Sequence, residues 1–192
     1  FFFSKMNSIN FIVNEEEYVH VAIIRTEFTN FEHAENGGAI YMFNSGLTCN
    51  GGVFTSCKAQ NGGGGGIFVY NDFDIYNFVN LTDLHFKSCQ ASFGGAVYVY
   101  AKSEYHETNI LRCIFEKNEI TSSSSSKLFG GSAVYLTTVN ADISGCSFTN
   151  NNGKGGALKI TEDFDVIPPK NNNLTKILAA QNHNIKGSIH IS

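Results

Sequence analysis

Residues 86–100 read FKSCQASFGGAVYVY, and this stretch holds two motifs that recur along the chain. In the first motif, a phenylalanine is followed three positions later by Cys or Asn, except in the first copy, where Asn30 comes one position early after Phe28. In the second, a pair of glycines precedes a short run of alternating side chains. Successive side chains of a β-strand point to opposite faces, so the alternation predicts a strand directly after each glycine pair.

Both motifs return in the same order five times, which indicates a repeat protein. The phenylalanines are 26, 32, 29 and 33 positions apart, and they are Phe28, Phe54, Phe86, Phe115 and Phe148. Ser132 replaces the second glycine of the fourth pair. The glycines of the second motif are Gly37, Gly38, Gly64, Gly65, Gly94, Gly95, Gly131, Gly155 and Gly156.

A strand of about five residues cannot bury its apolar face alone, but stacked copies at roughly 4.8 Å bury a continuous core. We therefore predict an all-β fold, a right-handed parallel β-helix of five to six coils. The phenylalanines would form one inward stack, and each glycine pair would supply the backbone angles of a turn. An aliphatic ladder would lie beside the stack, formed by Ile40, Ile67, Val97, Val134 and Leu158.

The Cys or Asn of the first motif is expected at the next corner, where Asn can bond its own backbone or the Asn one coil along. A β-sandwich is the competing fold. It would need alternating hairpins, and it would not explain why two motifs return in a fixed order.

The whole chain, residues 1–192, is interpreted as one β-helix domain. A partial coil at 1–27 precedes the repeats at 28–160, and an irregular end with a degenerate coil occupies 161–192. We expect a piece of a longer chain. The open strand edges of such a piece predict end-to-end self-association.

Charge and cysteine usage narrow the function classes. The net charge is −4, and the 13 Lys and Arg form no stripe, so nucleic-acid binding is not expected. No apolar run reaches the roughly 20 residues that span a bilayer. The five cysteines are an odd number, which argues against a closed disulfide framework. Cys57 with Cys89, and Cys113 with Cys146, should stack in adjacent coils as buried thiols, with a disulfide left open as the alternative.

The paired motifs, GGA before an aliphatic residue and FxxN, resemble the repeats of the chlamydial polymorphic outer membrane proteins. Similar repeats occur in surface proteins of trichomonad parasites. The resemblance covers residues 28–160, although FxxN is strict only at Phe115 and Phe148. It implies a β-helical passenger at the cell surface or outside the cell, anchored to a membrane and used for adhesion or antigenic display. Its implied partner is a host-cell or extracellular protein or glycan, and it brings no catalytic residue and no cofactor.

Parallel β-helices also include polysaccharide lyases and hydrolases, which need carboxylates placed together. One acidic motif recurs at the same offset from its glycine pair, at residues 72–75 (DFDI) and 163–166 (DFDV). It is interpreted as a weak cation or sugar site, or more simply as a solvated turn. The two copies lie too far apart to share one ion at roughly 2.4 Å. We expect no basic residue beside either copy, and no catalytic, metal or cofactor site.

Two further sets of residues are candidates for the outer surface. Asn80 and Asn173 each begin an Asn-x-Thr triplet, the acceptor sequence for N-glycosylation. Five tyrosines in or just after the repeated strands could form an aromatic contact strip, with some of them internal instead: Tyr41, Tyr70, Tyr98, Tyr100 and Tyr135.

Overall fold

The computed structural model describes residues 2–4, 9–12, 19–73, 76–103, 105–121, 130–138, 140–153, 155–161, 173–175, 178–180 and 189–191. All regular elements in these segments are β-strands, and every paired strand runs parallel to its neighbour. The predicted parallel β-helix is confirmed, and the β-sandwich, which needs antiparallel hairpins, is excluded. Because these segments hold no helix, they contain none that could span a membrane.

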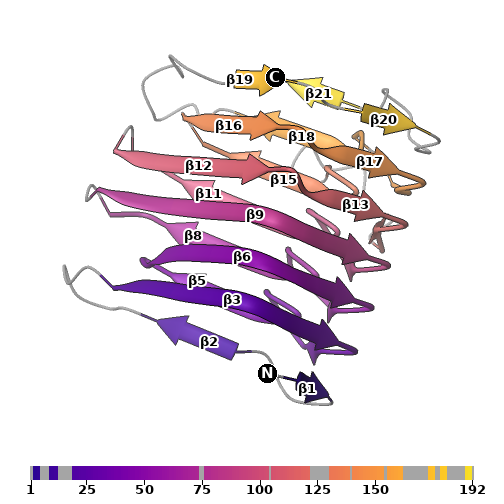
Figure 1. The fold of residues 1–192 in the computed structure, drawn as a ribbon, viewed down its shortest axis with the longest axis horizontal. Helices are drawn as coiled ribbons and strands as arrows, with labels where there is room; N and C mark the ends of the chain where they lie inside the picture. Colours follow the sequence, from indigo (N-terminus) through magenta and orange to yellow (C-terminus); the bar gives the residue numbers. More distant parts are fainter. Residues whose placement is uncertain are drawn as a thin grey trace.

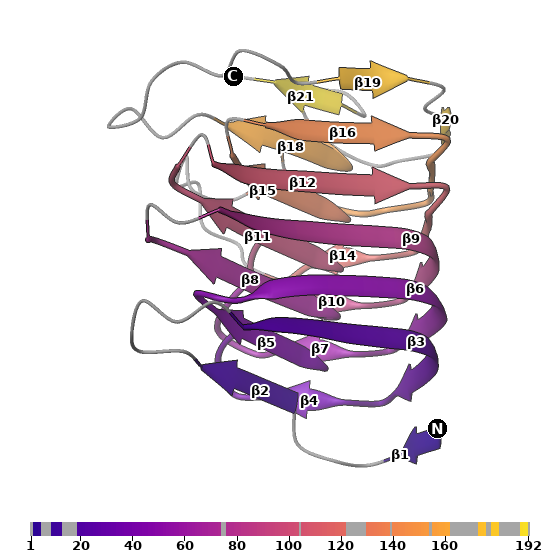
Figure 2. The same ribbon diagram turned by 60° about the vertical axis from the view of Figure 1, so that its left-hand side comes forward.

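Three parallel sheets wrap around one core (Figures 1 and 2). The large sheet contains β1 (Phe2–Ser4), β3 (His20–Thr29), β6 (Gly46–Thr55), β9 (Asn77–Lys87), β12 (His106–Leu111), β13 (Ile114–Glu116), β16 (Ala141–Ser144), β17 (Ser147–Thr149), β19 (Asn173–Thr175) and β20 (Leu178–Ala180). The glycine-pair sheet contains β2 (Ile9–Ile12), β5 (Ile40–Phe43), β8 (Ile67–Asn71), β11 (Val97–Ala101), β15 (Val134–Thr137), β18 (Leu158–Thr161) and β21 (Ile189–Ile191). The small sheet contains β4 (Glu32–His33), β7 (Lys58–Ala59), β10 (Gln90–Ala91) and β14 (Glu119–Ile120).

Each coil runs through the large sheet, the small sheet and the glycine-pair sheet in that order, and the path is right-handed (Figure 1). Four coils of the described chain have a strand in all three sheets, slightly fewer than the five to six predicted. In the next coil, the small sheet is reduced to a single bridge between Glu119 and Asn152. The short strands near both ends extend the large and glycine-pair sheets.

The phenylalanines of the first motif form one stack inside the solenoid, beneath the large sheet. Their ring centroids are 4.6, 4.7, 5.1 and 4.8 Å apart from Phe28 through to Phe148, and all five side chains are fully buried. Parallel register places each ring directly over its copy. Offset-stacked rings at this separation attract each other beyond their buried area, so the stack stabilises coil-to-coil packing.

Strand alternation separates the two faces of the glycine-pair sheet. Ile40 is in register with Ile67, which is in register with Val97, and this inward ladder continues through Val134 to Leu158. Every member of the ladder is fully buried. The intervening residues of each strand point outward, and they form the columns described below.

Left-handed backbone residues turn the chain at each corner. The first glycine of a pair has a φ of 65° at Gly37 and Gly64, a conformation that glycine adopts without steric cost. Two further bends in each coil use other residues with left-handed φ. In the first coil these residues are Arg25, within β3, and Asn30, directly after β3. The residue two positions after each phenylalanine, Asn30 in the first coil, therefore makes the bend that we expected one position later.

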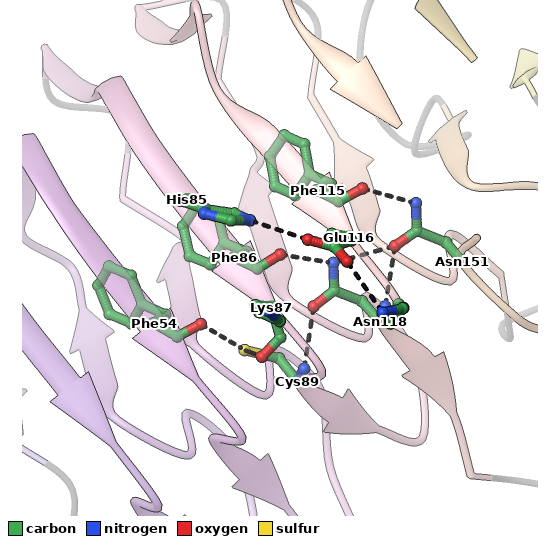
Figure 3. A network of polar contacts seen from close by, with 10 residues as sticks. Phe54, His85, Phe86, Lys87, Cys89, Phe115, Glu116, Asn118 and Asn151 are labelled. Carbon is green, nitrogen blue, oxygen red and sulfur yellow. Dashed lines mark hydrogen bonds and ion pairs between the residues drawn. The ribbon is translucent and has the colours of Figure 1, made fainter. Parts of the chain in front are cut away.

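From Phe54 onward, the residue three positions after each phenylalanine is instead buried and links neighbouring coils (Figure 3). Asn118 Nδ2 donates to the Phe86 carbonyl (3.1 Å) and to Asn151 Oδ1 (3.0 Å). Asn118 Oδ1 accepts from the backbone N–H of Cys89 at 2.9 Å. This amide ladder satisfies backbone groups that the bend would otherwise leave buried and unpaired.

The five cysteines are free, buried thiols. Cys89 stands in the amide-ladder position, where its Sγ donates weakly to the Phe54 carbonyl at 3.5 Å. The Cys113 backbone N–H donates to Cys146 Sγ at 3.4 Å, so these two residues are stacked in adjacent coils as expected. Its hydrogen bond with Cys146 and its burial raise the pKa of the Cys113 thiol, which keeps that thiol protonated.

Candidate functional site

The outer side of the glycine-pair sheet has two aromatic columns. In the first, Tyr41 stacks on Phe68 at 5.4 Å between ring centroids, and Phe68 stacks on Tyr98 at 4.9 Å. Phe93 contacts Tyr98 and Tyr135 edge-on, and Lys159 Nζ lies 4.6 Å from the Tyr135 ring centre. The side chains around this column cover it so closely that Phe68 and Tyr135 are buried.

The second aromatic column consists of Phe43, Tyr70 and Tyr100, with centroid separations of 5.7 and 4.5 Å and nearly parallel rings. Parallel rings that stack coil upon coil cover one another's faces. The middle ring, Tyr70, therefore offers its edge and hydroxyl to a partner but no free face. The expected aromatic contact strip is a pair of packed ladders, which stabilise the solenoid as the inner phenylalanine stack does.

Among the tyrosines that the structure describes, the exposed ones are two that lie outside the repeated motifs. Tyr76 and Tyr105 directly precede β9 and β12, and they are 58% and 55% exposed. Since Asn77 pairs with His106, the two tyrosines occupy equivalent positions in adjacent coils. The Tyr76 ring touches Phe78 at 6.3 Å and a tilt of 53°, and the described residues place no ring against Tyr105.

Two rows of outward-facing residues continue from these tyrosines across the large sheet. Asn80 and Asn109 are in register, and the Asn109 Nδ2 donates to the Asn80 Oδ1 at 2.8 Å. Glu107 is exposed, and it is in register with Phe78. These residues form one outward surface, which we call the tyrosine face: Tyr76, Phe78, Asn80, Tyr105, Glu107 and Asn109.

A histidine from the first coil borders the tyrosine face. The His20 ring lies 4.2 Å from the Phe78 ring, although a whole coil separates their strands. Gly46 makes this contact possible, because a Cβ there would lie 2.3 Å from His20 Nδ1. Burial lowers the pKa of His20, and its Nε2 is 2.8 Å from the Thr48 hydroxyl. The neutral ring therefore packs here as an apolar neighbour of Phe78.

The acidic motif at residues 72–75 is only partly described. The Asp72 carboxylate forms an ion pair with Lys102 of the next coil, at 3.3 Å between Oδ1 and Nζ. Our expectation that no basic residue lies near this motif was therefore wrong. The two residues are 30 positions apart in the chain, so only coil stacking brings them together. Asp74 and the second copy at 163–166 lie outside the described residues.

Both glycosylation triplets have their Asn in one column of the large sheet. Asn80 is half-buried in β9, and the column continues through Asn109 and Asp142 to Asn173. Thr82 lies two residues after Asn80 in the same strand, so it is on the same face as Asn80. Asn80 therefore occupies an outward position that an attached glycan could leave toward solvent.

Among the residues that the structure describes, no three His, Cys, Asp or Glu side chains gather closely enough to hold a metal ion. Comparisons with protein-family models, with curated proteins and with solved structures find no match to this chain. Its likeness to the polymorphic outer membrane proteins thus rests on the two repeated motifs alone.

Proposed function

We propose that this chain belongs to a non-enzymatic β-helix protein, located at the cell surface or outside the cell, that serves adhesion or antigenic display. The observation that carries the proposal is the tyrosine face, where exposed rings and amides lie in register on adjacent coils. A solenoid presents such rows as one extended contact surface. The two repeated motifs support the same function, because they resemble those of surface-exposed passengers.

The placement of reactive groups also favours display over catalysis. The thiols of all five cysteines are buried, and burial raises the pKa of Cys49 to about 12. A thiol such as that of Cys49, buried and protonated, is a poor nucleophile. On the surface, Asp83 forms a bidentate ion pair with Arg112, at 2.7 and 2.8 Å, which holds the pKa of that carboxyl below its usual range. Such a carboxylate is a poor general acid near neutral pH.

Adhesion can be tested with beads that carry the chain. Beads coated with the folded chain should bind cultured epithelial cells or extracellular matrix more strongly than beads coated with the same chain after irreversible unfolding. Equal retention of folded, unfolded and albumin-coated beads on every surface would refute an adhesive role.

A polysaccharide-cleaving enzyme is the second candidate, and the ion pair between Asp72 and Lys102 is the observation that favours it. The carboxylate stabilises the ammonium form, so Lys102 could act as a base only after a bound substrate breaks this ion pair. The test is product formation from pectate, pectin and alginate, with and without Ca²⁺. Unsaturated ends that appear with the native chain and disappear with Asp72→Ala would replace the adhesion proposal with catalysis.

A further inference from the structure

The two tyrosines of the tyrosine face differ from every stacked tyrosine of the aromatic columns. Tyr76 and Tyr105 are 58% and 55% exposed to solvent, whereas Tyr70 lies between two rings. An aromatic ring is electron-rich on its face. The C–H bonds on one side of a pyranose ring carry partial positive charge and match such a face. Exposed ring faces are therefore suited to sugars, and stacked ones are not.

The groups beside the tyrosines suit sugar hydroxyls. Each Asn side chain both donates and accepts, as a hydroxyl does, and Asn80 and Asn109 present such amides in register. The bond from Asn109 Nδ2 to Asn80 Oδ1 fixes the orientation of both amides. Glu107 adds an exposed acceptor one coil above Phe78. Aromatic platforms with a few oriented polar groups are the usual composition of a sugar-binding surface.

The spacing fits a linear chain of sugars along the solenoid axis. Tyr76 and Tyr105 are one coil apart, and adjacent strands of a sheet are about 4.8 Å apart. One pyranose unit of an extended glycan covers a similar length. A glycan that runs along the axis would therefore meet one tyrosine and one amide in each coil.

Charge selects among the possible partners. Glu107 is exposed, and the Asp72 carboxylate holds the Lys102 ammonium in an ion pair. The ion pair leaves Lys102 with little attraction for an anion, and the exposed Glu107 carboxylate with the net charge of −4 repels acidic glycans and nucleic acids. A stable protein partner would need roughly 800 Å² with an apolar centre, and two tyrosines among amides and a carboxylate do not form one.

We propose that the tyrosine face binds a neutral, linear glycan along the axis of the solenoid, with Tyr76 and Tyr105 as its two platforms. This inference rests on the proposed adhesive function and names the chemistry of the partner.

Isothermal titration calorimetry with cellohexaose, chitohexaose, mannohexaose and the acidic hexagalacturonate tests the inference. The chain is produced in bacteria, so Asn80 carries no glycan. We expect at least one neutral hexasaccharide to bind and hexagalacturonate to bind more weakly. The double variant Tyr76→Ala with Tyr105→Ala should weaken binding about tenfold or more, which corresponds to about 1.4 kcal/mol.

Two controls separate ring loss from unfolding. The double variant with Phe at both positions keeps the ring faces and should keep the affinity. Ile114→Ala removes a residue that is 46% exposed elsewhere on the large sheet, and it should change nothing. The inference is overturned if the Ala variant binds like the native chain, if the acidic glycan binds best, or if no neutral glycan binds. Coated beads that still adhere to cells in those cases would show that only the partner class is wrong.

Discussion

Replacement of Asn118 tests whether the amide ladder holds the coils together. The side chain of Asn118 satisfies two buried backbone groups on the preceding coil, the N–H of Cys89 and the carbonyl of Phe86. Leucine has a similar volume and no polar atom, so Asn118→Leu leaves both groups buried and unpaired. Each such group costs about 1–3 kcal/mol, so we expect a loss of about 2–6 kcal/mol in the free energy of unfolding.

A cysteine at this position should have an effect between those of Asn and Leu. Cys89 occupies the ladder position one coil earlier, and its thiol donates to the Phe54 carbonyl. Asn118→Cys should therefore keep a weak donor to Phe86 and lose only the acceptor for the Cys89 N–H, at a cost of about 1–3 kcal/mol. Asn152→Ala is the matched control, because Asn152 is exposed and its bond to Glu119 lies at the surface. Its effect should stay within about 0.5 kcal/mol.

Urea unfolding followed by circular dichroism gives the order of stability, and hydrogen exchange of the Cys89 amide gives the local effect. We expect native and Asn152→Ala to be the most stable, then Asn118→Cys, then Asn118→Leu. The Cys89 amide should exchange faster in both Asn118 variants. If Asn118→Leu unfolds at the native urea concentration, or if the Cys89 amide stays equally protected in it, the amide ladder does not stabilise the coils.

Four further predictions follow from the described contacts. Burial raises the pKa of Cys49 from 9.0 to about 12, so the unfolded chain loses the thiol proton at a lower pH than the folded chain. The stability that Cys49 contributes should therefore fall as the pH rises from 9 toward 12. In a pH series of urea midpoints, Cys49→Ala should flatten this part of the curve. Arg112→Ala should leave the urea midpoint unchanged at high salt, since the pair with Asp83 is solvent-exposed and screened; a large shift there would show that the pair is structural. Secretion from eukaryotic cells should add a glycan at Asn80 that Thr82→Val removes, and this glycan should weaken oligosaccharide binding because it covers part of the tyrosine face; an intact mass without added sugar would contradict the modification. The expected end-to-end self-association predicts a larger apparent size at higher concentration in sizing chromatography, and a monomer at all concentrations would argue against it.

The sequence predicted the packing of the core well, because the core residues recur in every coil. A phenylalanine that returns in every coil must stack if the coils stack, and Phe54 over Phe86 shows this directly. The aliphatic ladder follows from the same period. The left-handed corner residues were missed where they are not glycine, as at Arg25 and Asp83, because these residue types do not indicate a bend on their own.

The surface was much harder to predict, since exposure depends on what each coil places beside a residue. Tyr70 lies in a repeated strand and is covered by its neighbours, whereas Tyr76, only six residues later, lies outside the column and is exposed. The pair of Asp72 and Lys102 was missed for a related reason, because it joins residues from different coils. Contacts along the axis depend on register, which the loop lengths set and composition does not reveal.

The central claim is that this solenoid holds a glycan and leaves it intact, and one measurement tests both parts. A mixture of neutral and acidic oligosaccharides is passed over the immobilised chain, and mass spectrometry compares the flow-through with the eluate. The account predicts that neutral oligosaccharides are retained and elute with unchanged mass. Shortened or unsaturated products would show an enzyme, and a flow-through identical to the applied mixture would show that the tyrosine face binds no such glycan.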